Sequence, residues 1–134
     1  MTVEEIHEAV MAALNALAGP KLTVYDGLVP ETPATNYAVL WMNPGRAEST
    51  RVGWKATDMA ADFQVTCVSR NSQRGALATV GLVRGKLTGF RLGEGPNAPR
   101  CKENANPPTP PPDKSVPGDI RFWMPLPYRV VTSI

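Results

Sequence analysis

The stretch MAADFQVTCVSRNSQRGALATVGLVRGKLTG, residues 59–89, decides the fold of this chain. Its first part alternates between apolar and polar side chains, which is typical of a strand with one buried and one exposed face. The alternation stops at residues 70–72, where Asn71 or Ser72 can cap a helix by accepting hydrogen bonds from its free N–H groups. The residues predicted to face the core from this strand are Ala61, Phe63, Val65 and Cys67.

A helix is predicted to follow, because the apolar spacing changes to a helical period from Ala76 onward. Gly81 and Gly85 lie four residues apart and weaken a helix, so we interpret them as a place where another backbone packs closely. Gly89 is expected to end the helix. The predicted apolar face consists of Ala76, Val80, Val83 and Leu87, with Leu77 beside them.

An N-terminal helix is predicted from Thr2 to Ala18. Thr2 and Glu5 have the spacing of a capping box, in which side chains satisfy free backbone N–H groups at the helix start. Gly19 and Pro20 form a stop signal directly after the helix. The predicted apolar stripe consists of Val3, Ile6, Val10, Leu14 and Leu17, with Ala13 beside them.

Two strands are predicted between that helix and the central stretch. Lys21 to Tyr25 is a short strand followed by an Asp–Gly turn, and residues 29–36, with two prolines, are predicted to be a loop. Tyr37 to Asn43, YAVLWMN, is continuously apolar and rich in strand-forming residues. Such a run is typical of a central strand that is covered on both faces. We expect Val39 of this strand to face the two helices together with Phe63, Val65 and Cys67.

A last strand is predicted from Asp119 to Ile134, in which alternate residues are apolar. Pro125 and Pro127 cannot donate to a strand ladder, which indicates an edge strand or a bulge. The resulting order is helix, three strands, helix, loop and strand. It predicts one α+β domain over residues 1–134, with two layers: a mostly antiparallel sheet and two helices on one face. The residues predicted to face the core from the last strand are Phe122, Met124, Leu126, Tyr128 and Val130.

The segment 93–118, GEGPNAPRCKENANPPTPPPDKSVPG, interrupts this pattern with no periodicity. Its prolines forbid a helix and favour an extended polyproline conformation. It contains too few apolar side chains to order itself, so we expect contacts from outside its own domain to hold it as an interface arm. The interface residues predicted here are Lys102, Pro107, Pro110, Pro111, Pro112 and Lys114.

Residues 46–58 are predicted to form a long, exposed hairpin connection that is polar and basic. Two interpretations of Trp54 stay open: it packs back on the sheet, or it anchors a partner. The basic side chains of this loop and of the helix region up to Arg91 either meet phosphates or an acidic partner, or form an ordinary solvated surface. The interface residues predicted in this loop are Arg46, Arg51, Trp54 and Lys55.

The sequence shows no set of residues that indicates catalysis, a cofactor site or a metal site. His7 is the single histidine and is expected to be a solvated helix residue. Cys67 and Cys101 have no metal-ligand spacing and are expected to be free thiols. The sequence Gly-Glu-Gly at 93–95 is not a phosphate-binding loop, because no helix follows it. We therefore expect a protein that is not an enzyme.

The composition limits the compartment and the partners. The net charge of +2 favours no particular partner, and no apolar run approaches the roughly 20 residues that cross a bilayer. Glu4, Glu5 and Glu8 argue against a secretory signal peptide, whose start is basic. We expect a chain that is made and used in a cytoplasm, with no membrane partner.

Several stretches resemble the tail terminator, or head–tail joining, family of long-tailed bacteriophages. The first is VYDGLVPETPATNYAVLW at 24–41, which follows the N-terminal helix. The second is DFQVTCVSRNSQRGALATVGLVRGKLTGFRL at 62–92, and a third is the closing strand FWMPLPYRVVTS at 122–133. A variable segment before the end is also similar, although 93–118 is longer than the hairpin expected of the family.

The resemblance implies a small α+β subunit that assembles into a ring, expected to be a hexamer. Such a ring caps the growing tail tube, stops its polymerisation and presents a surface to the head–tail connector. The lumen passes DNA without sequence-specific binding. The implied partners are further copies of the chain, the tail tube protein and the connector, and the implied location is the virion neck, after assembly in the host cytoplasm.

Two alternatives remain. One is another phage neck or head-completion protein. The other is a small nucleic-acid-binding α+β domain that uses the basic region 46–91. Single-strand binders interleave aromatic side chains with basic ones, and here only Trp54, Phe63 and Phe90 are available, of which Phe63 is predicted to be in the core.

Overall fold

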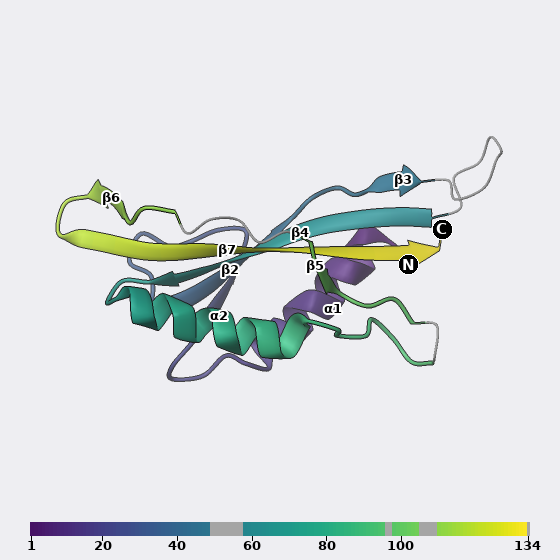
Figure 1. Cartoon of the computed structure of the whole chain (residues 1–134), viewed down its shortest axis with the longest axis horizontal. Helices are drawn as coiled ribbons and strands as arrows, with labels where there is room; N and C mark the ends of the chain where they lie inside the picture. Colours follow the sequence, from purple (N-terminus) through teal and green to yellow (C-terminus); the bar gives the residue numbers. More distant parts are fainter. Residues whose placement is uncertain (49–57, 96–97, 105–109, 134) are drawn as a thin grey trace.

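The computed structural model describes residues 1–48, 58–95, 98–104 and 110–133. The sheet has the strand order β1-β2-β4-β7-β5, while β3 pairs with β4 and β6 pairs with β7. Among the described strand pairs only β1–β2 is parallel, and both helices pack on one side of the sheet (Figure 1). The predicted α+β class is confirmed. The elements are α1 Val3–Asn15, β1 Thr23–Asp26, β2 Asn36–Met42, β3 Arg46–Glu48, β4 Asp58–Ser69, α2 Gln73–Leu87, β5 Lys102–Glu103, β6 Asp113–Val116 and β7 Asp119–Ser133.

The long strands β4 and β7 form the centre of the sheet and run along the whole molecule (Figure 1). They pair antiparallel from Asp58 opposite Ser133 to Ser69 opposite Phe122. Alternate residues of both strands point to the helices and are buried, as the alternating sequence predicts. Phe63 of β4 stacks on Tyr128 of β7, with ring centroids 5.4 Å apart.

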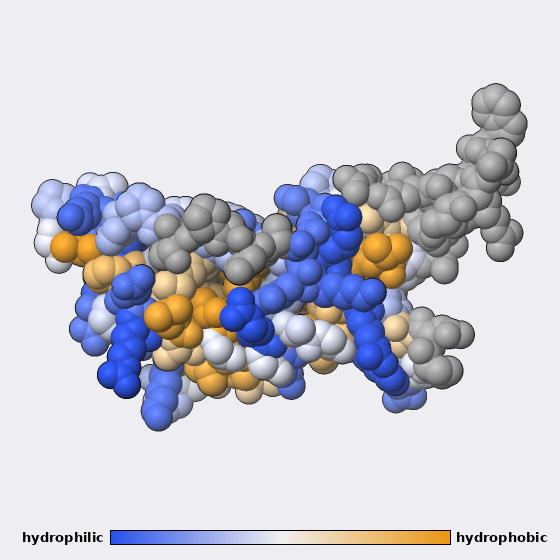
Figure 2. All heavy atoms as spheres, in the orientation of Figure 1, coloured by the Kyte–Doolittle hydropathy of each residue, from blue (hydrophilic) through white to orange (hydrophobic). Residues whose placement is uncertain are grey.

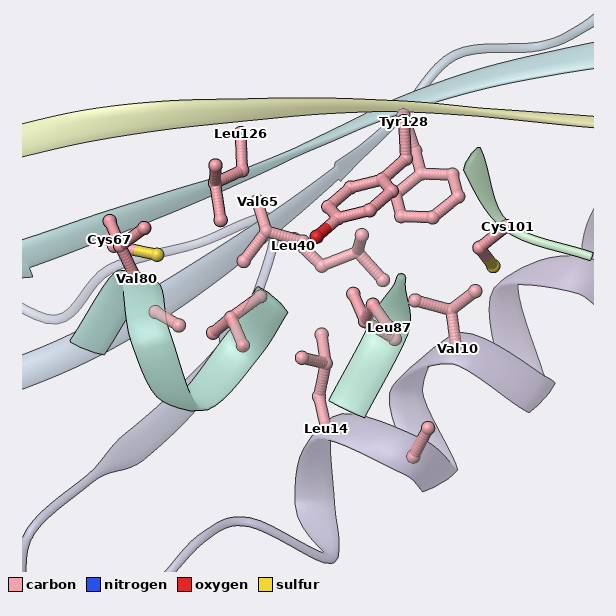
Figure 3. Close-up of a cluster of buried hydrophobic side chains, with 14 of the residues drawn as sticks. Val10, Leu14, Leu40, Val65, Cys67, Val80, Leu87, Cys101, Leu126 and Tyr128 are labelled. Atoms are coloured by element: carbon pink, nitrogen blue, oxygen red, sulfur yellow. The ribbon is translucent and has the colours of Figure 1, made fainter. Parts of the chain in front are cut away.

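The core between sheet and helices contains most of the predicted apolar residues of both helices (Figure 3). Val3 of the predicted stripe is half-buried and lies outside this cluster. Leu17 packs at its margin and is half-buried. One prediction about the core is wrong: Val39 is buried on the opposite side of the sheet, with Tyr37 and Val68. Side chains alternate along β2, so Val39 cannot share a face with Ala38 and Leu40. The helix residues of the core include Ile6, Val10, Ala13, Leu14, Ala76, Val80, Val83 and Leu87.

The helix ends follow the predicted caps. Thr2 and Glu5 form the capping box, and Ser72 is the N-cap of α2, accepting a hydrogen bond from the Gly75 N–H at 3.0 Å. Gly89 has φ +78° directly after the α2 C-cap, as a helix-ending glycine requires. α1 ends at Asn15, three residues before the predicted end.

Two predictions about α2 are wrong. Leu77 lies outside the apolar face and is 54% exposed. The glycines Gly81 and Gly85 do not mark a close contact, since a Cβ at either position would meet no described atom within 4 Å. The close contact is at Gly75, where a Cβ would lie 2.5 Å from Ser69 Oγ. Gly75 lies in the first turn of α2, where the turn from β4 brings Ser69 against the helix.

The Pro-rich segment is tied to its own domain through residues 98–104 and 110–118, so the prediction that only an outside partner holds it is wrong. The Cys101 side chain is fully buried in the core, and its N–H donates to the Phe90 carbonyl at 2.9 Å. β5 and β6 both pair with β7. Backbone hydrogen bonds and one buried thiol therefore replace the apolar content that the segment lacks.

The backbone positions of the two prolines of β7 face away from β4, toward the side of the strand where β5 and β6 pair. The Pro127 carbonyl accepts a hydrogen bond from the Asn104 N–H at 3.0 Å, so its missing N–H faces β5 rather than β4. Pro125, two residues away, faces the same side. All the N–H groups of β7 that pair with β4 are therefore present. The prediction of an edge is confirmed for the opposite side of β7, where no described strand pairs with the residues that lie between its contacts to β5 and to β6.

The hairpin connection predicted at 46–58 is confirmed at its base. Its first residues are not loop but strand β3, in which Arg46 pairs with Ala60 and Glu48 with Asp58. Residues 49–57 lie outside the described residues.

Candidate interaction surface

The sheet face opposite the helices is the candidate functional site. In an antiparallel sheet with one face on the core, the other face is normally polar. Here it carries a second apolar cluster, in which Tyr37, Val39 and Val68 are buried. Tyr25, Val29 and Trp123 pack against this cluster and are only partly buried. We refer to this side of the sheet as the open face.

A groove runs across the open face. Its volume is about 180 Å³, and β2, β4 and β7 supply its floor. Trp41 at one side of the groove is 44% exposed, while Tyr37 is held edge-to-face by Tyr25, with ring centroids 5.5 Å apart. Large exposed aromatic side chains beside a groove are typical of interaction sites. The residues that line the groove are Val29, Tyr37, Val39, Trp41, Thr66, Val68, Asp113, Arg121 and Trp123.

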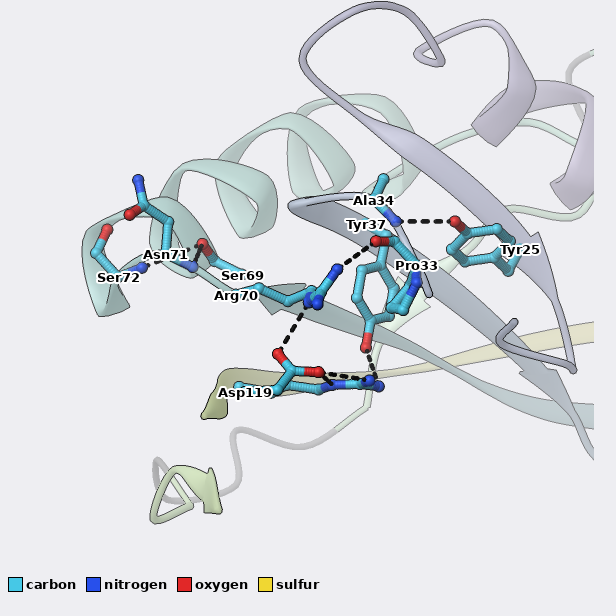
Figure 4. Close-up of polar contacts among 10 residues, drawn as sticks. Tyr25, Pro33, Ala34, Tyr37, Ser69, Arg70, Asn71, Ser72 and Asp119 are labelled. Carbon is cyan, nitrogen blue, oxygen red and sulfur yellow. Dashed lines mark hydrogen bonds and ion pairs between the residues drawn. The ribbon is translucent and has the colours of Figure 1, made fainter. Parts of the chain in front are cut away.

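One end of the groove is held by a network around Asp119 (Figure 4). Its carboxylate accepts hydrogen bonds from Arg70 Nε at 2.9 Å and from Arg121 Nη2 at 3.0 Å. Arg70 Nη1 also donates to the Pro33 carbonyl, and Arg121 Nη1 donates to the Tyr37 hydroxyl at 3.1 Å. The network therefore connects the loop before β2, the turn after β4 and the start of β7.

The electrostatics of this network indicate a structural role. The Asp119 side chain is only 14% exposed, and the hydrogen bonds from Arg70 and Arg121 lower the pKa of its carboxyl. Burial raises the pKa of Tyr37, which keeps its hydroxyl neutral. These groups fix the end of the groove. Its net charge is close to zero, because the positive charges of Arg70 and Arg121 lie opposite the negative charges of Asp113 and Asp119.

The basic residues that the sequence offers for phosphate binding are partly neutralised. Arg70 is engaged by Asp119, and Arg84 of α2 is paired with Glu103 of β5. Arg74 and Arg91 are exposed on the surface. The described part of the predicted basic region is thus interrupted by ion pairs.

The predicted interface residues do not gather in one place. Lys102 is exposed on β5, where it lines a wide depression of about 480 Å³ with Arg100, Glu103 and Val131. Pro110 and Pro112 line a small cavity with Phe122 and Trp123 at the outer edge of β7. Pro111 and Lys114 are exposed, and Arg46 begins β3. Arg51, Trp54, Lys55 and Pro107 lie outside the described residues.

Sequence reasoning missed the residues that distinguish the open face, namely Trp41, Arg121 and Trp123. The unbroken apolar run of β2 could have indicated Trp41, because a strand that is apolar on both faces needs other segments to cover each face. For Arg121 there was no such signal, because its partners Tyr37 and Asp119 meet only in the folded chain.

The groups with potential reactivity are placed apart from one another. His7 Nε2 on α1 lies 2.7 Å from Asp26 Oδ1 at the end of β1, on the surface. Burial raises the pKa of both Cys67 and Cys101 to about 12, so both thiols are protonated at neutral pH. Within the described residues, no three His, Cys, Asp or Glu side chains are grouped to hold a metal ion, and no helix is long and apolar enough to span a membrane.

No protein-family model matches this chain, and no curated protein matches its sequence.

Proposed function

We propose that this chain is the tail terminator of a long-tailed bacteriophage. In this role, copies of the chain form a ring, expected to be a hexamer, at the head-proximal end of the tail tube. The ring ends tube polymerisation and provides the joint to the head–tail connector, with DNA passing through its lumen. The sequence resemblance at 24–41, 62–92 and 122–133 supports this proposal, and the α+β fold is the one that the resemblance implies.

The observation that carries the proposal is the open face. A monomer with a water-exposed sheet face normally fills that face with polar side chains, whereas this one has a groove between Trp41 and Trp123. A protein that works by assembly needs surfaces of this kind, because burial of apolar area drives most protein association. The open face gives the proposed ring subunit a surface to bury.

The alternative of a nucleic-acid-binding domain has less support. Strong binding to phosphates requires several free cations on one surface. Arg70 and Arg84 are committed to Asp119 and Glu103, and the groove end is close to neutral. The second alternative, another neck or head-completion protein, also works by assembly. Experiment distinguishes it from a tail terminator.

The test combines assembly with tube growth. Purified chain is examined by light scattering and electron microscopy, and is then added in small amounts to polymerising tail tube protein. A tail terminator forms rings and arrests tubes at short lengths. Unchanged tube growth in the presence of folded chain would overturn the proposal, and binding to the connector alone would favour another neck protein.

A further inference from the structure

We infer that a row of cationic side chains at the β5 edge of the open face binds the acidic start of α1 from a second copy of the chain, so that copies associate head to tail. This inference rests on the proposed ring and names two surfaces that would form its contacts. We refer to the four side chains Arg91, Arg100, Lys102 and Arg129 as the cation row.

The cation row consists of two pairs of like charges in the strand ladder. Arg91 lies opposite Arg100 in a bridge between the chain after α2 and the chain before β5. Lys102 of β5 lies opposite Arg129 of β7. Residues opposite each other in an antiparallel pair point to the same side, and like charges in such positions destabilise the pair. An anion that binds between them would remove this repulsion.

All four cations point away from the core. Cys101 is fully buried in the core, so Arg100 and Lys102 on either side of it point the opposite way. Their partners across the ladder share that direction, which is the side of the open face. Figure 2 shows strongly hydrophilic side chains gathered over β5.

The carboxylates of Asp62 and Glu103, which lie beside the cation row, are already engaged. Asp62 of β4 binds Arg129, with Oδ1 2.7 Å from Nε. Glu103 of β5 is paired with Arg84 of α2. The other three cations of the row are exposed and make no ion pair with any described residue. Positive charge therefore remains in excess on this surface.

The surface beside the row is hollow. Arg100, Lys102 and Arg129 line the depression of about 480 Å³, and exposed Val131 adds an apolar group to it. Its described lining contains no aromatic side chain on which a nucleic acid base could stack. Carboxylates on a protein segment therefore suit this surface better than a single-stranded nucleic acid does.

The start of α1 carries the matching charge. Glu4 and Glu8 are four residues apart, so they lie on the same side of the helix. Both are exposed and make no ion pair with any described residue. α1 contains no lysine or arginine that would offset them. Unpaired cations and unpaired carboxylates on one chain favour a second copy as the occupant, because complementary charges select and orient partners.

The position of the two surfaces determines the kind of assembly. The cation row points to the open face, whereas α1 packs on the opposite face of the sheet. One copy can therefore use its row with one neighbour and its α1 with another. Such heterologous contacts make closed rings when the rotation between copies closes, and filaments when it does not. A closed ring is the product that the proposed function requires.

The experiment reverses the charge of each surface in the full chain. The row variant carries Arg100→Glu and Lys102→Glu, and the helix variant carries Glu4→Lys and Glu8→Lys. All four positions are exposed, so circular dichroism should show the secondary structure of the wild type. Each variant alone brings like charges together and should lose the ring where the wild type is fully assembled, with affinity reduced about tenfold or more.

The matched control is Arg74→Glu. Arg74 is an exposed cation of α2 that lies outside both surfaces, so its reversal changes the net charge equally per site and should leave the ring intact. The wild-type ring should also weaken as the salt concentration rises, because exposed charges are screened.

Mixing the two variants gives the decisive result. The row variant keeps its acidic α1, which can bind the unchanged cation row of the helix variant. The new lysines of the helix variant can bind the new glutamates of the row variant. A 1:1 mixture should therefore form rings of alternating copies, although neither variant assembles alone.

Rings from either variant alone, or a mixture of the two folded variants that stays monomeric, would overturn the inference. A wild-type chain that stays monomeric at all concentrations, or that stops at dimers, would overturn it too.

A nucleic acid is the competing occupant of the cation row. Fluorescence anisotropy of labelled single-stranded and duplex DNA measures it, and the wild type and the row variant should not differ in DNA binding. DNA binding that is lost in the row variant, while that variant still forms rings, would reject a second copy as the occupant.

The tube-growth experiment reports on the proposed function separately. Rings that depend on both charged surfaces but leave tube growth unchanged would support the inference and reject the function. Arrested tubes together with charge-reversed variants that still form rings would do the reverse.

Discussion

The two faces of the sheet differ in how completely the chain covers them. On the helix side, Phe63, Val65 and Tyr128 are almost fully excluded from water under α1 and α2. On the open face, Tyr37 and Val39 are equally buried, yet Trp41 of the same strand is 44% exposed. Strand β2 therefore contributes to a fully covered core on the helix side and to an incompletely covered apolar cluster on the open face.

The difference teaches that apolar content does not by itself distinguish a fold-forming face from a binding face. β2 is apolar at almost every position, and the sequence pattern predicts cover on both sides. The helices provide the cover on one side. On the other, a loop, Trp123 and the Asp119 network reach only part of the surface.

The largest expected effect is on the helix side. Leu14 is fully buried between α1 and the sheet, so Leu14→Ala should lower the free energy of unfolding by about 2–5 kcal/mol. Trp41→Gln on the open face should lower it less, by about 1 kcal/mol in the monomer, because Trp41 is 44% exposed. Urea unfolding at a concentration that keeps the chain monomeric measures both. Equal losses would mean that the open face belongs to the core.

A second pair of variants tests the packing of α2. In Gly75→Ala the new methyl group would meet Ser69 Oγ, which accepts hydrogen bonds from the Asn71 and Ser72 N–H groups, and stability should fall by about 1–3 kcal/mol. In Gly81→Ala the methyl group meets no described atom within 4 Å, so stability should rise by about 0.5–1 kcal/mol.

Thermal midpoints of the two glycine variants measure these opposite shifts. A loss in both would mean that the exposed side of α2 packs against something within the single chain.

The hydrogen-bond network around Asp119 should make the stability of the protein depend on pH in the acid range. The pKa of Asp119 is lowered from 3.8 by Arg70 and Arg121, so its contribution to stability is complete above that value and is lost as the pH falls through the lowered pKa. The stability difference between wild type and Asp119→Asn should therefore be present at pH 6 and shrink towards pH 2. Urea midpoints across this range measure it, and a difference independent of pH would contradict the ion-pair explanation.

The smallest expected signal is the reaction of the two cysteines. Burial raises the pKa of Cys67 and Cys101 to about 12, against an ordinary value of 9.0, so both thiols should resist an aromatic disulfide reagent at pH 8 in the folded chain. Both should react at once in urea. Early reaction of Cys101 alone would show that the Pro-rich segment leaves the core before the rest of the domain unfolds.

Much of the fold could be predicted because its signals are local. The alternation of β4, the helical period of α2 and the Thr2–Glu5 cap each depend on residues a few positions apart. Periodicity assigns an element and divides its residues between two faces. It does not say which face meets the helices, which is why Val39 was placed on the wrong one.

The candidate site depended on contacts that no local pattern contains. Arg121 meets Tyr37 across 84 positions and Arg70 meets Asp119 across 49, so their pairing follows from the path of the chain. The same holds for Cys101, which anchors a proline-rich segment whose composition predicts no anchor.

The sequence by itself determined the class of the fold, the two helices, the strands β1, β2, β4 and β7, and the excess of apolar residues in β2. Only the tertiary structure decided that the helices cover one side of that strand and leave Trp41 exposed on the other. The physical reason is that periodicity is a property of neighbouring residues, whereas cover is supplied by segments that arrive from distant parts of the chain.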